Sequence, residues 1–140
     1  MIVAVTTPPS RAPRDYDDIP GTYVFDGARS REGYQLNMFC MSLNDEANRE
    51  VFRNDPGSYL DRYDLTVEQR EAVDQRDWLR MLQLGGNIYY TFKLAAFDGL
   101  SMQDVGGSMS AMTREAFSEM MVGGGRPIDG NRRVGEAGSE

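Results

Sequence analysis

Histidine is absent from the 140-residue sequence. Histidine is the usual general base near neutral pH and the commonest metal ligand in proteins. Its absence excludes a Ser-His-Asp triad, a two-histidine iron site and a histidine-containing zinc site. The chemistry that remains is limited to carboxylates, one thiol and metals with oxygen ligands. The sequence therefore excludes most independent enzymes, and we expect neither catalytic nor metal-binding residues in this chain.

Cysteine and long apolar runs are also scarce. Cys40 is the only cysteine, so no internal disulfide can form, and we expect a reducing compartment. No apolar run approaches the roughly 20 residues needed to cross a bilayer. The first residues carry no basic segment and reach Pro8 and Pro9 too early for a signal peptide. These features predict a cytoplasmic protein without a membrane segment.

Positive charge is in the minority. The chain has 15 lysines and arginines against 22 aspartates and glutamates, a net charge of -7. Proteins that bind a phosphate backbone need a basic stripe, so we expect no nucleic-acid partner. Lys93 is the only lysine. Arginine suits bidentate pairing with carboxylates at protein interfaces, although genome composition would explain this bias equally well.

The apolar residues that are present recur mainly with helical spacing. From about Ser30 onward, Leu36, Phe39, Cys40 and Leu43 form one apolar stripe. Similar stripes predict further helices around residues 47–52, 59–63, 66–73, 78–82, 87–97 and 113–122. No stretch shows sustained alternation of apolar and polar residues. The predicted class is therefore all-α, a single domain of several short helices.

Local signals indicate where these helices begin and end. Thr66 with Gln69 is a capping-box pattern, and Thr113 precedes the last helix. Glycine runs at 85–86 and 123–125 are typical helix stops. We expect residues 1–17 to form an extended or disordered arm, residues 18–125 the helical domain, and residues 126–140 a glycine-rich tail with little order of its own.

Two motifs could indicate a functional site, but a structural interpretation explains each of them better. Gly85 and Gly86 precede a helix, as in some anion-binding loops, but they lack the Lys-Ser/Thr of a nucleotide loop. A helix that stops and restarts explains them better. Asp15, Asp17 and Asp18 lack the spaced ligands of a calcium loop, so a solvated acidic segment is the better interpretation.

The sulfur-containing residues can also be interpreted either structurally or functionally. Cys40 lies on an apolar stripe with no histidine to activate it, which favours a buried, inert thiol. Five of the nine methionines fall late in the chain: Met102, Met109, Met112, Met120 and Met121. Methionine adapts to irregular apolar surfaces in cores and at interfaces. Core packing explains any one of them, but together with the glycines and Ser108 they indicate a surface shaped against a partner.

Longer stretches carry a resemblance to a known family. The chain resembles the small (alpha) subunits of the protocatechuate 4,5-dioxygenase type, within the type II extradiol ring-cleaving dioxygenases. The resemblance runs from about Asp17 to Glu136 and is carried by residues 18–22, 33–43, 85–90, 106–113, 119–126 and 130–136.

This resemblance implies a helical small subunit packed on a larger catalytic subunit, its beta subunit. In the family, the large subunit holds Fe(II) through two histidines and a glutamate and binds the catechol and O₂. The small subunit covers the mouth of that pocket, and two small subunits assemble with two large ones. The absence of histidine here agrees with that division of labour.

The resemblance also implies roles for particular residues. The family's loop over the partner's pocket corresponds here to residues 98–109, in which Met102, Gln103 and Asp104 are the expected lid. Met102 takes a position that is aromatic in some members, although it would also fit as packing inside the loop. Asp104 stands where an apolar residue is expected. The predicted subunit contacts are Phe39, Tyr90, Met109 and Met112, with arginines at their rim.

The predicted substrate is protocatechuate, with gallate or a related catechol acid as the alternative. Two further hypotheses stay open at this point. The chain could be a free-standing binding or regulatory module of the same fold. It could also be a carboxylate enzyme built on Asp15, Asp17 and Asp18.

Overall fold

The computed structural model describes residues 14–17 and 23–125. It divides the chain into two units, residues 1–24 with 128–140, and residues 25–127. In the first unit, the Asp17 N–H donates to the Arg14 carbonyl at 3.0 Å and closes a short turn. The predictions made for residues 1–13 and for the 126–140 tail lie outside the described residues.

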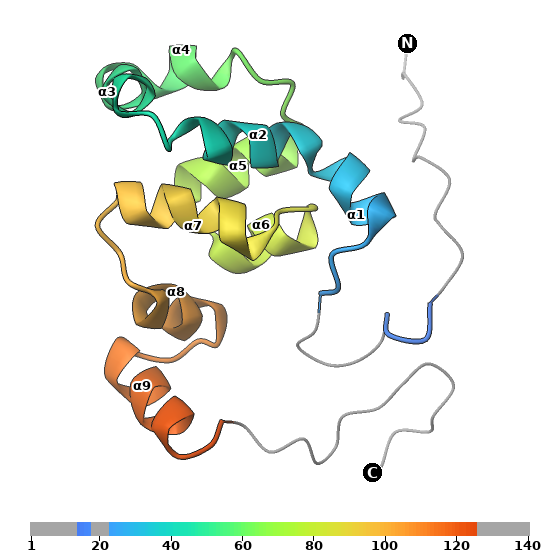
Figure 1. Cartoon of the computed structure of the whole chain (residues 1–140), viewed down its shortest axis with the longest axis vertical. Coiled ribbons are helices and arrows are strands. Elements are labelled where there is room, and N and C mark those ends of the chain that lie inside the picture. Colours follow the sequence, from blue (N-terminus) through green and yellow to red (C-terminus); the bar gives the residue numbers. More distant parts are fainter. Residues whose placement is uncertain (1–13, 18–22, 126–140) are drawn as a thin grey trace. The chain divides into compact units, whose positions relative to one another are not determined.

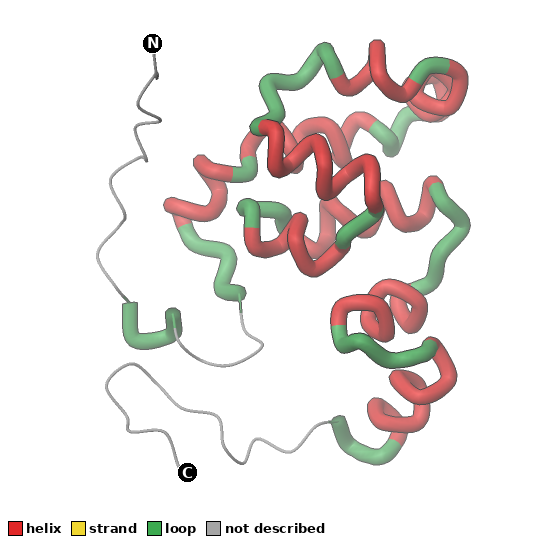
Figure 2. Tube along the Cα trace, turned by 180° about the vertical axis from the view of Figure 1, so that it is seen from behind, coloured by secondary structure: helices red, strands yellow, loops and turns green. Residues whose placement is uncertain are grey.

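The described part of the second unit is helical. Figure 1 shows its helices in chain order, and Figure 2 shows them joined by loops, with no strand in the described residues. The all-α prediction is confirmed. The helices are α1 (Gly27–Glu32), α2 (Tyr34–Ser42), α3 (Glu46–Asn54), α4 (Pro56–Leu60), α5 (Val67–Gln75), α6 (Trp78–Gln83), α7 (Ile88–Phe97), α8 (Met102–Met109) and α9 (Arg114–Val122).

Side-chain caps account for most helix starts. The predicted capping box is confirmed: Thr66 Oγ1 accepts the Gln69 N–H at 3.1 Å, and Gln69 Oε1 accepts the Thr66 N–H at 3.0 Å. Thr113 caps α9 as expected. The helix predicted from about Ser30 begins earlier, because Asp26 caps α1, and it is interrupted at Gly33.

Aromatic side chains form the centre of the core. Phe39 of α2 contacts Phe52 of α3 and Tyr59 of α4, with ring centroids 5.1 and 6.0 Å apart. All three are at most 1% exposed. Burial of each such ring contributes about 1.5–3 kcal/mol, and edge-to-face contacts add to that. The core therefore joins α2, α3 and α4, which are consecutive in sequence, through side-chain packing.

A close contact between two glycines connects the start of α2 to the turn before α7. A Cβ added at Gly33 would lie 1.9 Å from the carbonyl oxygen of Gly85. The two backbone segments could therefore not lie this close together if residue 33 carried a side chain. Asn37, which is 3% exposed, lies beside this contact. Its amide nitrogen donates to the Gly85 carbonyl at 3.1 Å, and its amide oxygen accepts the Asn87 N–H at 2.9 Å. This glycine–asparagine junction fixes the position from which α7 begins.

No helix in the described ranges combines the length and the apolar character that crossing a membrane requires.

Candidate functional site

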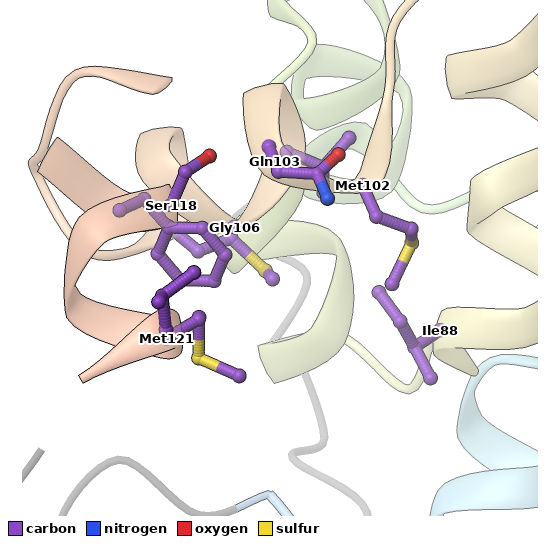
Figure 3. Close-up of a pocket in the computed structure, with 10 residues that line it drawn as sticks. Ile88, Met102, Gln103, Gly106, Ser118 and Met121 are labelled. Atoms are coloured by element: carbon purple, nitrogen blue, oxygen red, sulfur yellow. The ribbon is translucent and has the colours of Figure 1, made fainter. Parts of the chain in front are cut away.

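An apolar groove lies between α8, α9 and the first residue of α7. Its volume is about 380 Å³. Figure 3 shows Met102 directed toward Ile88, with Met121 and Ser118 of α9 on the other side. The residues that line it are Ile88, Met102, Gln103, Val105, Gly106, Met109, Phe117, Ser118, Met121 and Val122. The groove can receive an apolar side chain of another molecule.

Residues 102–109 were expected to belong to a loop, and that expectation is wrong for this segment. They form α8, which begins at Met102. Its start is a second capping box. Ser101 Oγ accepts the Asp104 N–H at 3.2 Å, and Asp104 Oδ2 accepts the Ser101 N–H at 2.8 Å. The Ser101-x-x-Asp104 pattern is visible in the sequence, but Gly106 and Gly107, which disfavour helix, obscured it.

Asp104 therefore has a structural explanation. The Ser101 backbone N–H, and then the Ser101 hydroxyl, donate to its carboxylate, and these bonds lower the pKa of Asp104 from its usual value. The lowered pKa keeps the carboxylate ionised near the N-terminus of α8, where negative charge is favoured. Of the three expected lid residues, Met102 and Gln103 line the groove, whereas Asp104 is turned to the start of its own helix.

The two consecutive glycines of α8 allow α9 to approach closely. A Cβ added at Gly106 would lie 2.4 Å from Cζ of Phe117, and one added at Gly107 would lie 2.9 Å from the Met112 carbonyl oxygen. Helix α8 packs against α9, and it also contacts α6. The absence of two side chains is therefore what brings Phe117 into the groove wall beside α8.

The rim of the groove exposes apolar side chains to an unusual degree. Met102 is 49% exposed, Met121 is 56% exposed and Val122 is 90% exposed. Tyr89, which follows the groove residue Ile88, is 78% exposed. Single exposed apolar residues are common on protein surfaces, but several around one apolar groove are typical of a contact site. This face is the candidate site for binding another protein.

The four expected subunit-contact residues do not lie together on this face. Met109 lines the groove, and Met112 is half-buried. Tyr90 is half-buried and packs against the core. Phe39 is 0% exposed and packs among Phe52 and Tyr59. Phe39 therefore has no exposed surface with which to contact a partner.

The groove also contains residues that sequence reasoning did not assign to a site. These are Ile88, Val105, Gly106, Phe117, Ser118 and Val122. The methionine cluster did point to Met121 as part of a surface for a partner. Nothing in the sequence placed Ile88 beside it, because the two residues belong to different helices and share no local pattern.

The remaining candidates for chemistry form no metal-ligand cluster in the part of the chain that the structure describes. No three His, Cys, Asp or Glu side chains of these residues lie close enough to hold a metal ion. Cys40 is 0% exposed, and burial raises the pKa of its thiol to about 12. The thiolate is therefore scarce near neutral pH. Asp17 accepts the Arg14 N–H at 2.7 Å within the short turn, and Asp18 lies outside the described residues.

The turn of Gly85 and Gly86 is likewise structural. Its groups are engaged within the chain, since Asn37 contacts both the Gly85 carbonyl and the Asn87 N–H. Gly85 has a φ of +97°, which ordinary side chains rarely adopt. The helix stop and restart expected from the sequence is confirmed, with α6 ending at Gln83 and α7 beginning at Ile88.

Comparison with known proteins agrees with the resemblance seen in the sequence. Residues 36–122, more than half of the chain, match the family model described as aromatic-ring-opening dioxygenase LigAB, LigA subunit. The chain is also 28% identical over 101 residues to gallate dioxygenase of Pseudomonas putida. That match covers 72% of this chain and 30% of the relative, so the chain spans less than a third of the relative's length. The chain belongs to the LigA-subunit family of the aromatic-ring-opening dioxygenases.

Proposed function

We propose that the chain is the non-catalytic small subunit of an extradiol ring-cleaving dioxygenase, of the protocatechuate 4,5-dioxygenase type. The single observation that carries this proposal is the apolar groove of α7, α8 and α9 with its exposed rim, in a chain of the LigA-subunit family. We propose that a large, catalytic subunit covers this face. Two small and two large subunits would form the cytoplasmic enzyme.

The chain's own residues do not fit the Fe(II) that such an enzyme requires. Iron sites of this kind need two histidines and a carboxylate, and the chain has no histidine. The iron therefore belongs to the large subunit in this proposal. The chain's contribution is to close the mouth of the partner's pocket. Met102 and Gln103, exposed at the rim, would exclude water and limit the orientations of the ring.

The substrate proposed is a catechol carboxylic acid. Protocatechuate is the first candidate, from the resemblance of the sequence stretches that include residues 33–43 and 106–113. Gallate is the second candidate, and the similarity to a gallate dioxygenase favours it. The two acids differ by one ring hydroxyl. The ratio of kcat/KM values for protocatechuate and gallate, measured on the reconstituted complex, decides between them.

Co-expression with the large subunit tests the proposal directly. We expect a stable complex that elutes as one peak and cleaves the ring, whereas the chain alone, supplied with ferrous iron and protocatechuate, gives no turnover. Two separate peaks would support the free-standing module instead. Turnover by the chain alone would refute the division of labour.

Met102→Ala tests the role of the groove rim in catalysis. We expect it to change KM or kcat of the complex while the iron content stays the same, because in this proposal Met102 would contact the partner's pocket and not the metal. Met41→Ala is the matched control, since Met41 is 36% exposed on α2 and does not line the groove. A Met102→Ala complex with the kinetics of the Met41→Ala complex would remove Met102 from the lid.

A further inference from the structure

The sulfur-containing residues of the described ranges differ widely in exposure. Met81 and Cys40 are 0% exposed in the core. Met102 and Met121, in contrast, are 49% and 56% exposed. They lie on opposite sides of one groove (Figure 3). The Cys40 thiol, with a pKa raised to about 12, is protonated near neutral pH as well as buried. Within the described ranges, the exposed sulfur atoms are therefore those of thioethers, and Met102 and Met121 are the exposed methionines that line the groove.

We propose that Met102 and Met121 form a reversible oxidation site, at which a peroxide converts the groove from an apolar to a polar surface and blocks assembly with the large subunit. The proposal rests on the proposed function, because it takes the groove as the face that the large subunit covers. It concerns the unassembled chain, in which that face is open to solvent.

The chemistry needs no group other than the thioether and the peroxide. The methionine sulfur donates an electron pair to one oxygen of hydrogen peroxide, an S–O bond forms and the O–O bond breaks. The other oxygen leaves as water with the two peroxide protons. The sulfur is oxidised by two electrons and the peroxide is reduced by two. A methionine sulfoxide reductase reverses the step, with two thiols oxidised to a disulfide and the oxygen released as water.

The groove has little that would satisfy a sulfoxide once a partner covers it. Besides Met102, Met121 and the half-buried Met109, its lining is aliphatic, aromatic or glycine, with Gln103 and Ser118 as its polar side chains. A sulfoxide oxygen is a strong acceptor, and covering it without a donor is unfavourable. Two such groups on opposite walls of a groove of about 380 Å³ would oppose the seating of an apolar anchor from the large subunit. We expect the dissociation constant to rise by at least about tenfold.

The first measurement does not depend on the partner. The purified full chain is treated with a limiting amount of hydrogen peroxide, and oxidation is located by peptide mass spectrometry. We expect Met102, Met121 and the exposed control Met41 to gain one oxygen well before Met81. Oxidation of Met81 at the same rate, in a chain whose circular dichroism is still native, would refute the site.

The second measurement determines the affinity for the large subunit. The dissociation constant is measured before oxidation, after it, and after repair by methionine sulfoxide reductases A and B. We expect oxidation to weaken binding and repair to restore it. In the Met102→Leu/Met121→Leu variant, leucine keeps a similar volume but cannot form a sulfoxide. For this variant, the dissociation constant after oxidation divided by the dissociation constant before oxidation should be close to one, whatever its starting affinity.

Further outcomes separate the two proposals. If the untreated chain does not bind the large subunit, the proposed function fails. If the untreated chain binds and the oxidised chain binds equally well, only the oxidation proposal fails. A Met41→Leu variant should lose affinity on oxidation as the unmodified chain does. If Met41→Leu instead abolished the effect, the site would lie outside the groove and the proposal would be wrong.

Discussion

Asn37 offers the sharpest test of how the groove wall is positioned. Its amide joins the start of α2 to the turn before α7, and Ile88 of the groove is the next residue after Asn87. Asn37→Ala removes both hydrogen bonds of that amide at once. It also leaves their partners, the Gly85 carbonyl and the Asn87 N–H, without the side chain that satisfied them.

The size of the effect follows from the burial of the two partners. Gly85 is buried, and a buried carbonyl left without a donor costs about 1–3 kcal/mol. Asn87 is half-buried, so loss of its hydrogen bond costs about 0.5–1.5 kcal/mol. We expect Asn37→Ala to lower the free energy of unfolding by about 1.5–4.5 kcal/mol, a large part of the roughly 5–15 kcal/mol typical of a domain.

Urea unfolding of the full chain, followed by far-UV circular dichroism, measures this change. Asn44→Ala is the matched control, because Asn44 is exposed, and it should stay within about 0.5 kcal/mol of the unmodified chain. An Asn37→Ala chain with the same midpoint and the same m-value as the unmodified chain would refute the reasoning.

Two further predictions concern the core. Gly33→Ala should lower the free energy of unfolding by about 3 kcal/mol or more in thermal denaturation, because its Cβ would meet the Gly85 carbonyl oxygen at 1.9 Å. Gly27→Ala, with nothing within 4 Å of the added Cβ, should be neutral or slightly stabilising, and similar losses in both would contradict the contact. The raised pKa of Cys40, about 12 against 9.0, makes the folded state retain a proton that the unfolded state loses. The protonated thiol therefore contributes fully to the free energy of unfolding below about pH 9. That contribution decreases by about 1.4 kcal/mol per pH unit up to about pH 12. Cys40→Ala should show a shallower decline in urea unfolding over that range, and an identical decline would refute a buried, protonated thiol.

The helical class and most helix positions could be predicted because they depend on near neighbours. An apolar stripe such as Leu36, Phe39 and Leu43 repeats over one or two turns. A cap such as Thr66 or Thr113 acts on a backbone N–H three residues away. The exclusion of a histidine-based iron site needed only the composition. These features could be predicted from the sequence without knowledge of the tertiary packing.

The groove could not be predicted, because it depends on residues far apart in the chain. Helix α8 forms although Gly106 and Gly107 disfavour helix, since a capping box starts it and α9 packs against those glycines. The sequence by itself determined which residues could be helical, apolar or reactive. Only the tertiary structure decided that Phe39 belongs to the core while Met102 stands at a rim. Both carry apolar side chains on amphipathic segments, and exposure is a property of the neighbours that folding brings to each.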